Sequence, residues 1–423
     1  MRYNCAVARV HPFRALRPTP EAAARVASVP YDVVSRSEAA ELAASNRLNF
    51  LHVSRAEIEF PTDVDPYSDD VYRAAADNFR KLRRQAPLVI EEDPSVYFYR
   101  LSKDGQSQTG LAACFSLDEY EHGAIKKHER TRRDKEDDRT RHMIALRAQT
   151  GPVFLTYRAL PDIDRIADRV SATAPLIDFT AVDAVRHTIW RVGTEECARI
   201  VQTFGKVPAL YIADGHHRAA SAARARRELR SAALAAAAEL ARHAGVNEYD
   251  TFLGVAFPHD QVRILPYNRV VQDLAGRSPE AFVAEVRRVA TVREGRLEPS
   301  RKGEVSMYLD GRWYAIELTT TEPGPDDDRV ASLDVTILQD RIIGPILNVN
   351  DVRTDKRIDF VGGLRGSGEL ERLVDRGASA VAFSMFPVTV ADLIAIADAG
   401  GIMPPKSTWF EPKLRDGLLS HLI

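Results

Sequence analysis

The chain has 423 residues, of which 45% are hydrophobic and 28% are charged, and its formal net charge is −2. This length is enough for two or three domains with well-filled cores. The near-balance of charge argues against a generally basic nucleic-acid-binding protein, because phosphate contacts usually need a clear excess of lysine and arginine.

The cysteines Cys5, Cys114 and Cys197 are far apart and show no paired metal-ligand spacing. This pattern is typical of reduced, mostly buried thiols and predicts a cytoplasmic protein. No apolar run approaches about 18 residues, and the N-terminus lacks the pattern of a signal peptide. We therefore expect no membrane span and no membrane partner.

The first hundred residues alternate between helix and strand signals. Pro30 fixes its own φ and restricts Val29, so the turn at 29–34 presents Tyr31 and Asp32 from a stiff corner. We predict helices from about Glu21, from Ser37 as N-cap to Ser45, and at 70–85, a strand at 49–53, and a hairpin of 96–101 with 109–117.

The next informative stretch, residues 125–139, is almost wholly charged, with both signs mixed. A solvated helix face with ion pairs explains such a run. The functional interpretation is that His128 and Glu129 act beside a phosphate that Arg130 and Thr131 help to hold. Composition alone does not separate the two.

Residues 211–218 (Tyr-Ile-Ala-Asp-Gly-His-His-Arg) have the pattern of a strand that ends at a glycine and is followed by a helix rich in alanine, up to about residue 243. A helix start has unpaired N–H groups and a partial positive charge, so this turn predicts an anion site. The groups around it are Asp214, Gly215, His216, His217 and Arg218.

These groups permit phosphoryl transfer, phosphate hydrolysis or a metal site. In the first case Arg218 and the helix start hold the phosphate, a histidine donates to its oxygens, and a carboxylate takes the proton of the attacking hydroxyl. Adjacent histidines on a helix point about 100° apart, which makes both ligating one ion awkward. In the purely structural alternative, Asp214 only caps the helix.

The remainder of the chain again mixes helix and strand signals. The glycine-rich run at 362–368 fits no nucleotide fingerprint and is interpreted as a plain loop. The tail from Met403 to Lys413 is rich in proline and aromatic residues and is expected to pack back on the body. Lys406, Ser407 and Thr408 of this tail are further candidates for binding substrate or phosphate.

The full chain resembles a bacterial and archaeal family named DUF1015. The resemblance is carried by 30–34 (Pro-Tyr-Asp-Val-Val), 128–131 (His-Glu-Arg-Thr), 211–218, 333–335 (Leu-Asp-Val) and 403–408 (Met-Pro-Pro-Lys-Ser-Thr). The Asp-Gly-His-His-Arg core is also similar to the motif of the ParB and sulfiredoxin superfamily, particularly archaeal free-serine kinases that use ADP. The resemblance implies a nucleotide-using fold and a serine-like substrate.

Two departures from these families bear on the substrate. Ala219 and Ala220 stand where a tyrosine and a glutamate are usual, and Asn268 stands where a histidine is usual before Arg269. An alanine supplies neither a hydroxyl nor a carboxylate.

We therefore expect a mixed α+β protein of the α/β type: an N-terminal α/β region over 1–110, a ParB/sulfiredoxin-like core over 111–270, and a C-terminal α+β region over 271–423 that packs back on the core. The leading hypothesis is a small-molecule kinase that uses ATP or ADP with Mg²⁺ and phosphorylates a small hydroxyl compound such as serine. Glu129, Asp214 and His217 are the expected catalytic residues, and Asp214 holds the metal or orients the hydroxyl. A ParB-like nucleotide- or DNA-binding regulator and a phosphohydrolase are the alternatives, and an oligomer is compatible with the sequence.

Overall fold

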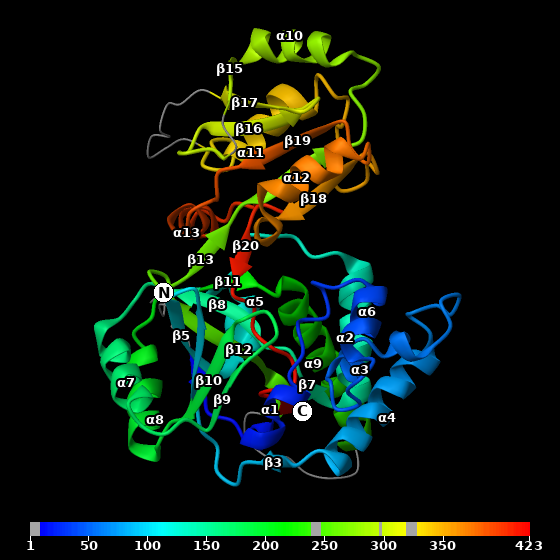
Figure 1. Ribbon diagram of the computed structural model, residues 1–423. Helices are drawn as coiled ribbons and strands as arrows, with labels where there is room; N and C mark the ends of the chain where they lie inside the picture. Colours follow the sequence, from blue (N-terminus) through cyan, green and yellow to red (C-terminus); the bar gives the residue numbers. More distant parts are fainter. Residues whose placement is uncertain (1–8, 238–246, 296–297, 319–327) are drawn as a thin grey trace. The chain divides into compact units, whose positions relative to one another are not determined.

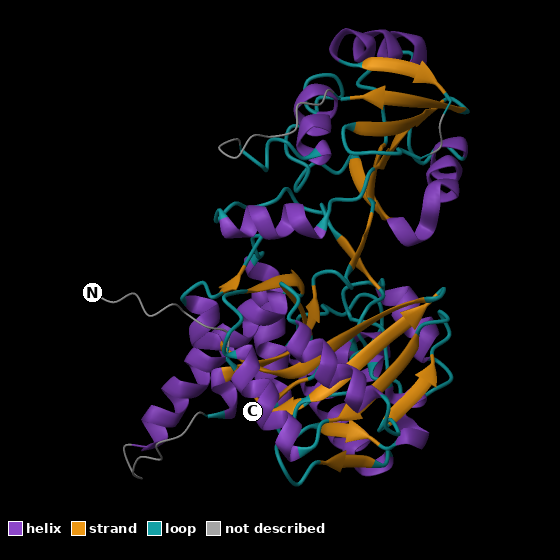
Figure 2. Ribbon diagram, turned by 90° about the vertical axis from the view of Figure 1, so that its left-hand side faces the viewer, coloured by secondary structure: helices purple, strands orange, loops and turns teal. Residues whose placement is uncertain are grey.

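The structure, a computed structural model, describes residues 9–237, 247–295, 298–318 and 328–423. The chain forms two compact units, one of Met1–Val262 with Pro412–Ile423 and one of Arg263–Glu411 (Figure 1). Each unit combines sheets and helices, as Figure 2 shows by colour. The prediction of a mixed α+β fold is confirmed.

The division of the chain differs from the three regions expected from the sequence. The expected boundaries at 110 and 270 lie inside strands β5 (Gln106–Ser116) and β14 (Tyr267–Val271). Strand β5 pairs with β4 (Tyr97–Lys103) and also with β12 (Thr251–Pro258). Backbone hydrogen bonds thus join the first hundred residues to the expected core in one sheet.

The main sheet of the first unit has the strand order β6-β11-β8-β12-β5-β4-β10-β9, and β1 pairs with β5. The other strands of this sheet are β1 (Val10–His11), β6 (Ile125–Lys126), β8 (Val153–Tyr157), β9 (Ile177–Thr180), β10 (Arg186–Arg191) and β11 (Leu210–Asp214). Strand β6 runs parallel to β11, with Ile125 opposite Leu210. The segments that follow these two strands therefore leave the sheet at the same edge.

Helices cover this sheet, and the apolar faces of α7, α8 and α9 join the strands in one core, for example through Ile166, Ile200 and Ala222. Helices α6 and α9 pack side by side (Figure 1). The helices of this unit are α1 (Pro20–Val26), α2 (Arg36–Ala43), α3 (Leu51–Ser54), α4 (Asp69–Gln85), α5 (Leu117–Glu121), α6 (Arg133–Leu146), α7 (Pro161–Ser171), α8 (Thr194–Phe204) and α9 (His216–Ala237).

Two local predictions in this unit were wrong. Residues 49–53 were expected to form a strand, but α3 occupies this place, and the side chain of Asn49 accepts a hydrogen bond from the Leu51 N–H at its start. Short apolar runs do not separate a buried strand from a buried helix. The N-cap of α2 is Ser35 rather than Ser37, because Ser35 and Glu38 form a capping box.

The second unit has a sheet with the strand order β15-β17-β16-β19-β14-β18 and a separate pair of β13 with β20. Its further elements are β13 (Arg263–Leu265), α10 (Pro279–Val289), β15 (Thr291–Glu294), β16 (Glu304–Leu309), β17 (Arg312–Glu317), α11 (Asp334–Leu338), β18 (Ile358–Gly362), α12 (Gly366–Asp375), β19 (Val381–Met385), α13 (Val390–Asp398) and β20 (Trp409–Glu411). The prediction that the glycine-rich run is a plain loop was wrong: Gly362 ends β18, Gly363–Arg365 form a short 3-10 helix, and residues 366–368 begin α12.

Within the described ranges, every helix is too short or too polar to cross a lipid bilayer. Cys114 and Cys197 are buried free thiols, as expected, and Cys5 lies outside the described residues.

Candidate active site

The predicted strand, turn and helix are present as β11, Gly215 and α9. Gly215 has a φ of +97°, and a Cβ atom added there would lie 2.8 Å from Nε of Arg218. Only glycine adopts this backbone without strain and leaves room for the guanidinium. The first turn of an α-helix carries a partial positive charge, so the start of α9 is compatible with the predicted anion site, which stays a prediction.

The charged stretch after β6 lies against this helix start. The backbone N–H of His128 donates to Nε2 of His216 at 3.4 Å, and the backbone N–H of Arg132 donates to Nε2 of His217 at 3.0 Å. The rings of His128 and His216 are perpendicular, with centroids 4.5 Å apart. The parallel pairing of β6 and β11 therefore brings together two stretches that are about 85 residues apart in the sequence.

His216 is a neutral imidazole in this arrangement. It is 4% exposed, and burial together with the neighbouring His128 holds its pKa well below the usual value. Because Nε2 accepts a hydrogen bond, the ring proton sits on Nδ1, which lies 3.9 Å from a carboxylate oxygen of Glu129. The side chain of Glu129 is 39% exposed, so solvent or a substrate can reach it.

His128 is the most unusual polar group of the site. It is 2% exposed, and neither ring nitrogen completes a hydrogen bond to the described residues. Burial lowers its pKa to about 4, although the backbone of Ile212 and the charge of Asp214 act in the opposite direction. Buried polar atoms in native proteins normally have partners, and the backbone of Ile212 is the hydrogen-bonding group that acts on this ring.

Asp214 is enclosed by two cations. Its Oδ2 lies 2.9 Å from Nζ of Lys413 and 3.6 Å from Nη2 of Arg218. Burial would raise the pKa of Asp214, but the charges of Lys413 and Arg218 outweigh this effect and hold the pKa below its usual value. Asp214 is therefore ionised and paired with both cations.

This pairing does not suit the expected magnesium ligand. A carboxylate that is already paired with both a lysine and an arginine has little remaining charge to offer a cation, and Mg²⁺ prefers anionic oxygen ligands. The described part of the chain also contains no group of three or more His, Cys, Asp or Glu side chains placed to hold a metal ion. A protein-held magnesium at Asp214 therefore does not fit this geometry.

Arg218 connects the turn to the interior of the first unit. It is 8% exposed, and its guanidinium donates to the carbonyl of Pro152, while Nε has no partner among the described residues. Burial would lower its pKa, but Asp32, Asp214 and Tyr31 together raise it. Arg218 is thus a permanent positive charge behind the helix start.

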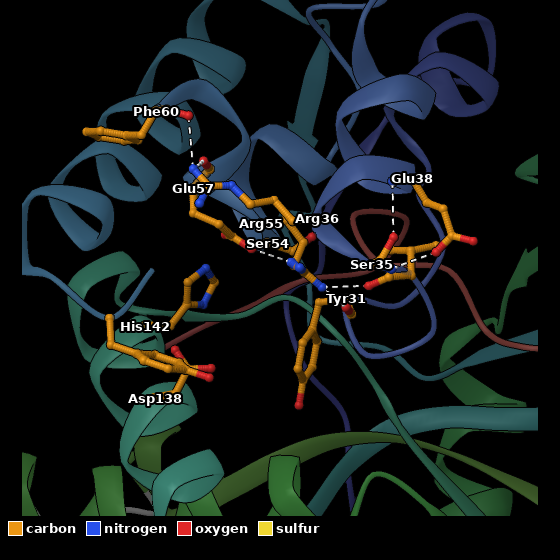
Figure 3. A network of polar contacts seen from close by, with 12 residues as sticks. Tyr31, Ser35, Arg36, Glu38, Ser54, Arg55, Glu57, Phe60, Asp138 and His142 are labelled. Atoms are coloured by element: carbon orange, nitrogen blue, oxygen red, sulfur yellow. Dashed lines mark hydrogen bonds and ion pairs between the residues drawn. The ribbon is translucent and has the colours of Figure 1, made fainter. Parts of the chain in front are cut away.

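Asp32 is a functional candidate that sequence reasoning presented but did not assign to the site. Arg55 donates to the carbonyls of Tyr31 and Val34, each at 2.7 Å, and so fixes the corner that carries Asp32 (Figure 3). The negative charge of Asp32 acts on Arg218, and it partly offsets the burial that lowers the pKa of His217. The signal in the sequence was the stiff corner around Pro30.

The hydrogen bonds that join the charged stretch to His216 and His217 do not involve the other residues predicted to bind substrate. Arg130 is exposed, and the hydroxyl of Thr131 donates to Glu136 of α6. Lys406, Ser407 and Thr408 belong to the second unit, where the Ser407 hydroxyl donates to the Pro404 carbonyl at 2.7 Å. Substrate binding by these five residues stays a prediction.

We expect acid to destabilise the protein partly through His128. The unfolded chain takes up a proton near the ordinary pKa of 6.5, whereas the folded site takes it up only near 4. Between these values the unfolded state binds more protons, so the free energy of unfolding falls as the pH falls through this window. At pH 5 the lowered pKa of His128 reduces the free energy of unfolding by about 2 kcal/mol relative to its value at neutral pH.

Urea unfolding of the wild type and His128→Asn at pH 7.5 and pH 5 measures this effect. The variant should lose less stability on acidification than the wild type, whereas the exposed His122→Asn should behave as the wild type does. An equal loss in the wild type and His128→Asn would contradict the assignment.

None of the curated proteins matches the sequence. Similar solved structures include a conserved hypothetical protein from Pyrococcus furiosus, with 14% identity, a TM-score of 0.35, and coverage of 73% of this chain and 94% of that chain. A free serine kinase in complex with AMP has 13% identity, a TM-score of 0.36, and coverage of 73% and 91%. SbnI from Staphylococcus aureus, with a C-terminal truncation, has 12% identity, a TM-score of 0.37, and coverage of 72% and 85%. Likenesses of this degree carry no weight for the chemistry of the site.

The match to a family model is much more extensive. The family described as "Protein of unknown function (DUF1015)" matches residues 10–336, which include both stretches that meet at the start of α9. This chain belongs to the DUF1015 family.

Proposed function

We propose that this protein is a phosphotransferase that moves the terminal phosphate of ATP or ADP to a small hydroxyl compound, with serine as the first candidate acceptor. The observation that carries the proposal is the buried, unpartnered ring of His128 at the start of α9, next to neutral His216 and partly exposed Glu129. In this proposal the start of α9 and His128 bind a phosphate, and the Glu129 carboxylate lies nearby.

Phosphate binding is assigned to the helix start and to neutral hydrogen-bond donors. The N–H groups after Gly215 and the ring N–H of His128 donate to phosphate oxygens, and buried Arg218 supplies a fixed positive charge behind them. His216 keeps the ring of His128 in place, and His217 anchors the Arg132 backbone beside the helix. Donors fixed in this way need little rearrangement when charge develops on the transferred group.

Glu129 is assigned as the base. The acceptor hydroxyl attacks the terminal phosphorus, its proton passes to the Glu129 carboxylate, and the bond to the bridging oxygen breaks, so that the nucleotide leaves with the electron pair. ADP then becomes AMP, or ATP becomes ADP. Positioning provides most of the catalysis of such a transfer, and a base typically adds about 10²–10⁴-fold.

Arg130, Thr131, Lys406, Ser407 and Thr408 are assigned to substrate binding. Their residue types suit this role, since arginine and lysine pair with phosphate or carboxylate groups and hydroxyls hydrogen-bond to either. Any magnesium in the reaction would be brought by the nucleotide, since Asp214 is already paired.

The test is incubation of the full chain with ADP or ATP, Mg²⁺ and serine, threonine, homoserine or glycerol, followed by mass spectrometry. A phosphorylated acceptor together with AMP or ADP supports the proposal, and the absence of any phosphorylated product would sink it. Inorganic phosphate released equally with and without acceptor would identify a phosphohydrolase instead. Salt-sensitive DNA binding without nucleotide turnover would favour the ParB-like regulator.

A further inference from the structure

The last residues of the chain belong to the first unit and supply a charge to the candidate site. After the second unit ends at Glu411, residues 412–423 return to the first unit. Lys413 there lies 2.9 Å from Asp214 and is 14% exposed at its side chain. A group 199 residues further along the chain than Asp214 thus contacts the strand that carries the predicted motif.

This C-terminal segment, residues 412–423, is held along its length. Every residue from Leu414 to His421 is buried. The N–H and carbonyl of Asp416 exchange hydrogen bonds with those of Ser28, and β21 (His421–Leu422) pairs with β7 (Ala148–Gln149), so the chain ends beside β7 (Figure 1). The segment is therefore built into the fold and does not lie loosely on it.

Arg415 and Asp416, which follow Lys413 closely in the chain, anchor the segment to the first unit. Arg415 is 4% exposed, donates to Nε2 of His187 at 3.2 Å and pairs with Asp183. The carboxyl of Asp416 lies so close to Gly151 that a Cβ there would be 2.7 Å from its Oδ1. Asp416, Arg218, Tyr31 and Arg139 line a cavity of about 40 Å³, which leaves little room for the segment to shift.

The charges around Asp214 show what the lysine does. Lys413 and Arg218 both lie next to the Asp214 carboxylate, so these three groups together carry one positive charge, which the charge of Asp32 near Arg218 partly offsets. Without Lys413, Asp214 would neutralise Arg218 and would draw its guanidinium, now at 3.6 Å, into a closer pair. The helix start would then face no excess positive charge, and an incoming phosphate would meet an exposed part of the Asp214 carboxylate.

We infer that Lys413 is a positioning residue of the anion site: it pairs with Asp214 and so leaves the positive charge of Arg218 available to the phosphate of a nucleoside diphosphate. The inference rests on the proposed function, because it concerns the same site. It assigns a role to the C-terminal segment, which lies outside the residues that the family model matches. The lysine acts through Asp214 and Arg218, so its removal should affect nucleotide binding.

The test is calorimetric titration of ADP at pH 7.5 into the full chain and its variants. Lys413→Met should weaken ADP binding by at least about tenfold, since truncation of one partner of a buried pair leaves the other uncompensated. Lys413→Arg, which keeps the charge, should stay within about threefold of the wild type. Lys81→Met, a change at an exposed lysine of α4, is the control and should have no effect.

A second variant separates the effect of the lost charge from the effect of lost packing. It also keeps the inference testable if Lys413→Met does not fold. The double variant Lys413→Met with Asp214→Asn removes both charges of the pair, restores the excess positive charge and should bring ADP affinity back to within about threefold of the wild type. An unchanged affinity in Lys413→Met, or a double variant that stays as weak as Lys413→Met, overturns the inference.

The outcomes distinguish this inference from the proposed function. Suppose that the wild type binds ADP, that the variants show the expected series of affinities, and that no acceptor is phosphorylated. This result supports the role of Lys413 and contradicts the proposed phosphotransferase activity. If the wild type binds neither ADP nor inorganic phosphate, the anion site is contradicted, and so are both proposals.

Discussion

Replacing Glu129 with glutamine should lower the turnover of phosphate transfer by about 10²–10⁴-fold, the usual contribution of a general base. Glutamine keeps the size of the side chain and an oxygen near Nδ1 of His216 but cannot take up the proton of the acceptor hydroxyl. The KM for nucleotide should change little, because phosphate binding is assigned to the helix start, His128 and Arg218. The measurement is steady-state kinetics with the acceptor that the wild type uses.

Glu92→Gln is the matched control for this change, since Glu92 is an exposed glutamate of the same unit. It should have wild-type kinetics. The free energy of unfolding of Glu129→Gln should stay within about 0.5 kcal/mol of the wild type, as expected for a partly exposed side chain. Turnover within threefold of the wild type would remove Glu129 from the role of base.

Replacing Gly215 with alanine should damage both stability and anion binding. The φ of +97° is unfavourable for alanine, and the added Cβ would lie 2.8 Å from Nε and 3.0 Å from Cζ of Arg218. Strain of this kind costs roughly 1–3 kcal/mol. Relief of the contact must move the guanidinium away from the helix start, so ADP affinity should fall by at least about tenfold, in line with the loss of a buried charge contact.

Gly123→Ala separates these two effects. Gly123 also has a positive φ, +81°, but a Cβ there meets nothing within 4 Å. This control should show the backbone strain in chemical denaturation and should keep wild-type ADP affinity. If Gly215→Ala bound ADP as tightly as Gly123→Ala does, the close approach of Arg218 to the turn would have no part in anion binding.

The core of the candidate site could be predicted from the sequence because its signals are local. A strand that ends at glycine, followed by alanine, arginine and leucine without a helix breaker, specifies a strand, turn and helix within about 30 residues. The chemistry of Asp214 to Arg218 follows from that local geometry. The charge run was harder to interpret, since composition does not separate a solvated face from a site.

Only the tertiary structure showed that His128 and Glu129 lie at the start of α9, because the parallel pairing of β6 with β11 joins segments about 85 residues apart. The same holds for the pairing of β5 with β12, which joins the predicted hairpin to a distant strand of the main sheet.

Lys413 is the clearest case of what the sequence could not show. Nothing in the residues around it distinguishes it from any other lysine of the tail, and its contact with Asp214 spans 199 positions. Residue types and local backbone preferences specified the strand, the glycine turn and the helix start of the candidate anion site. Which cation neutralises Asp214, and hence which positive charge remains for a ligand, depends on long-range packing, in which a buried C-terminal segment places one ammonium group 2.9 Å from one carboxylate.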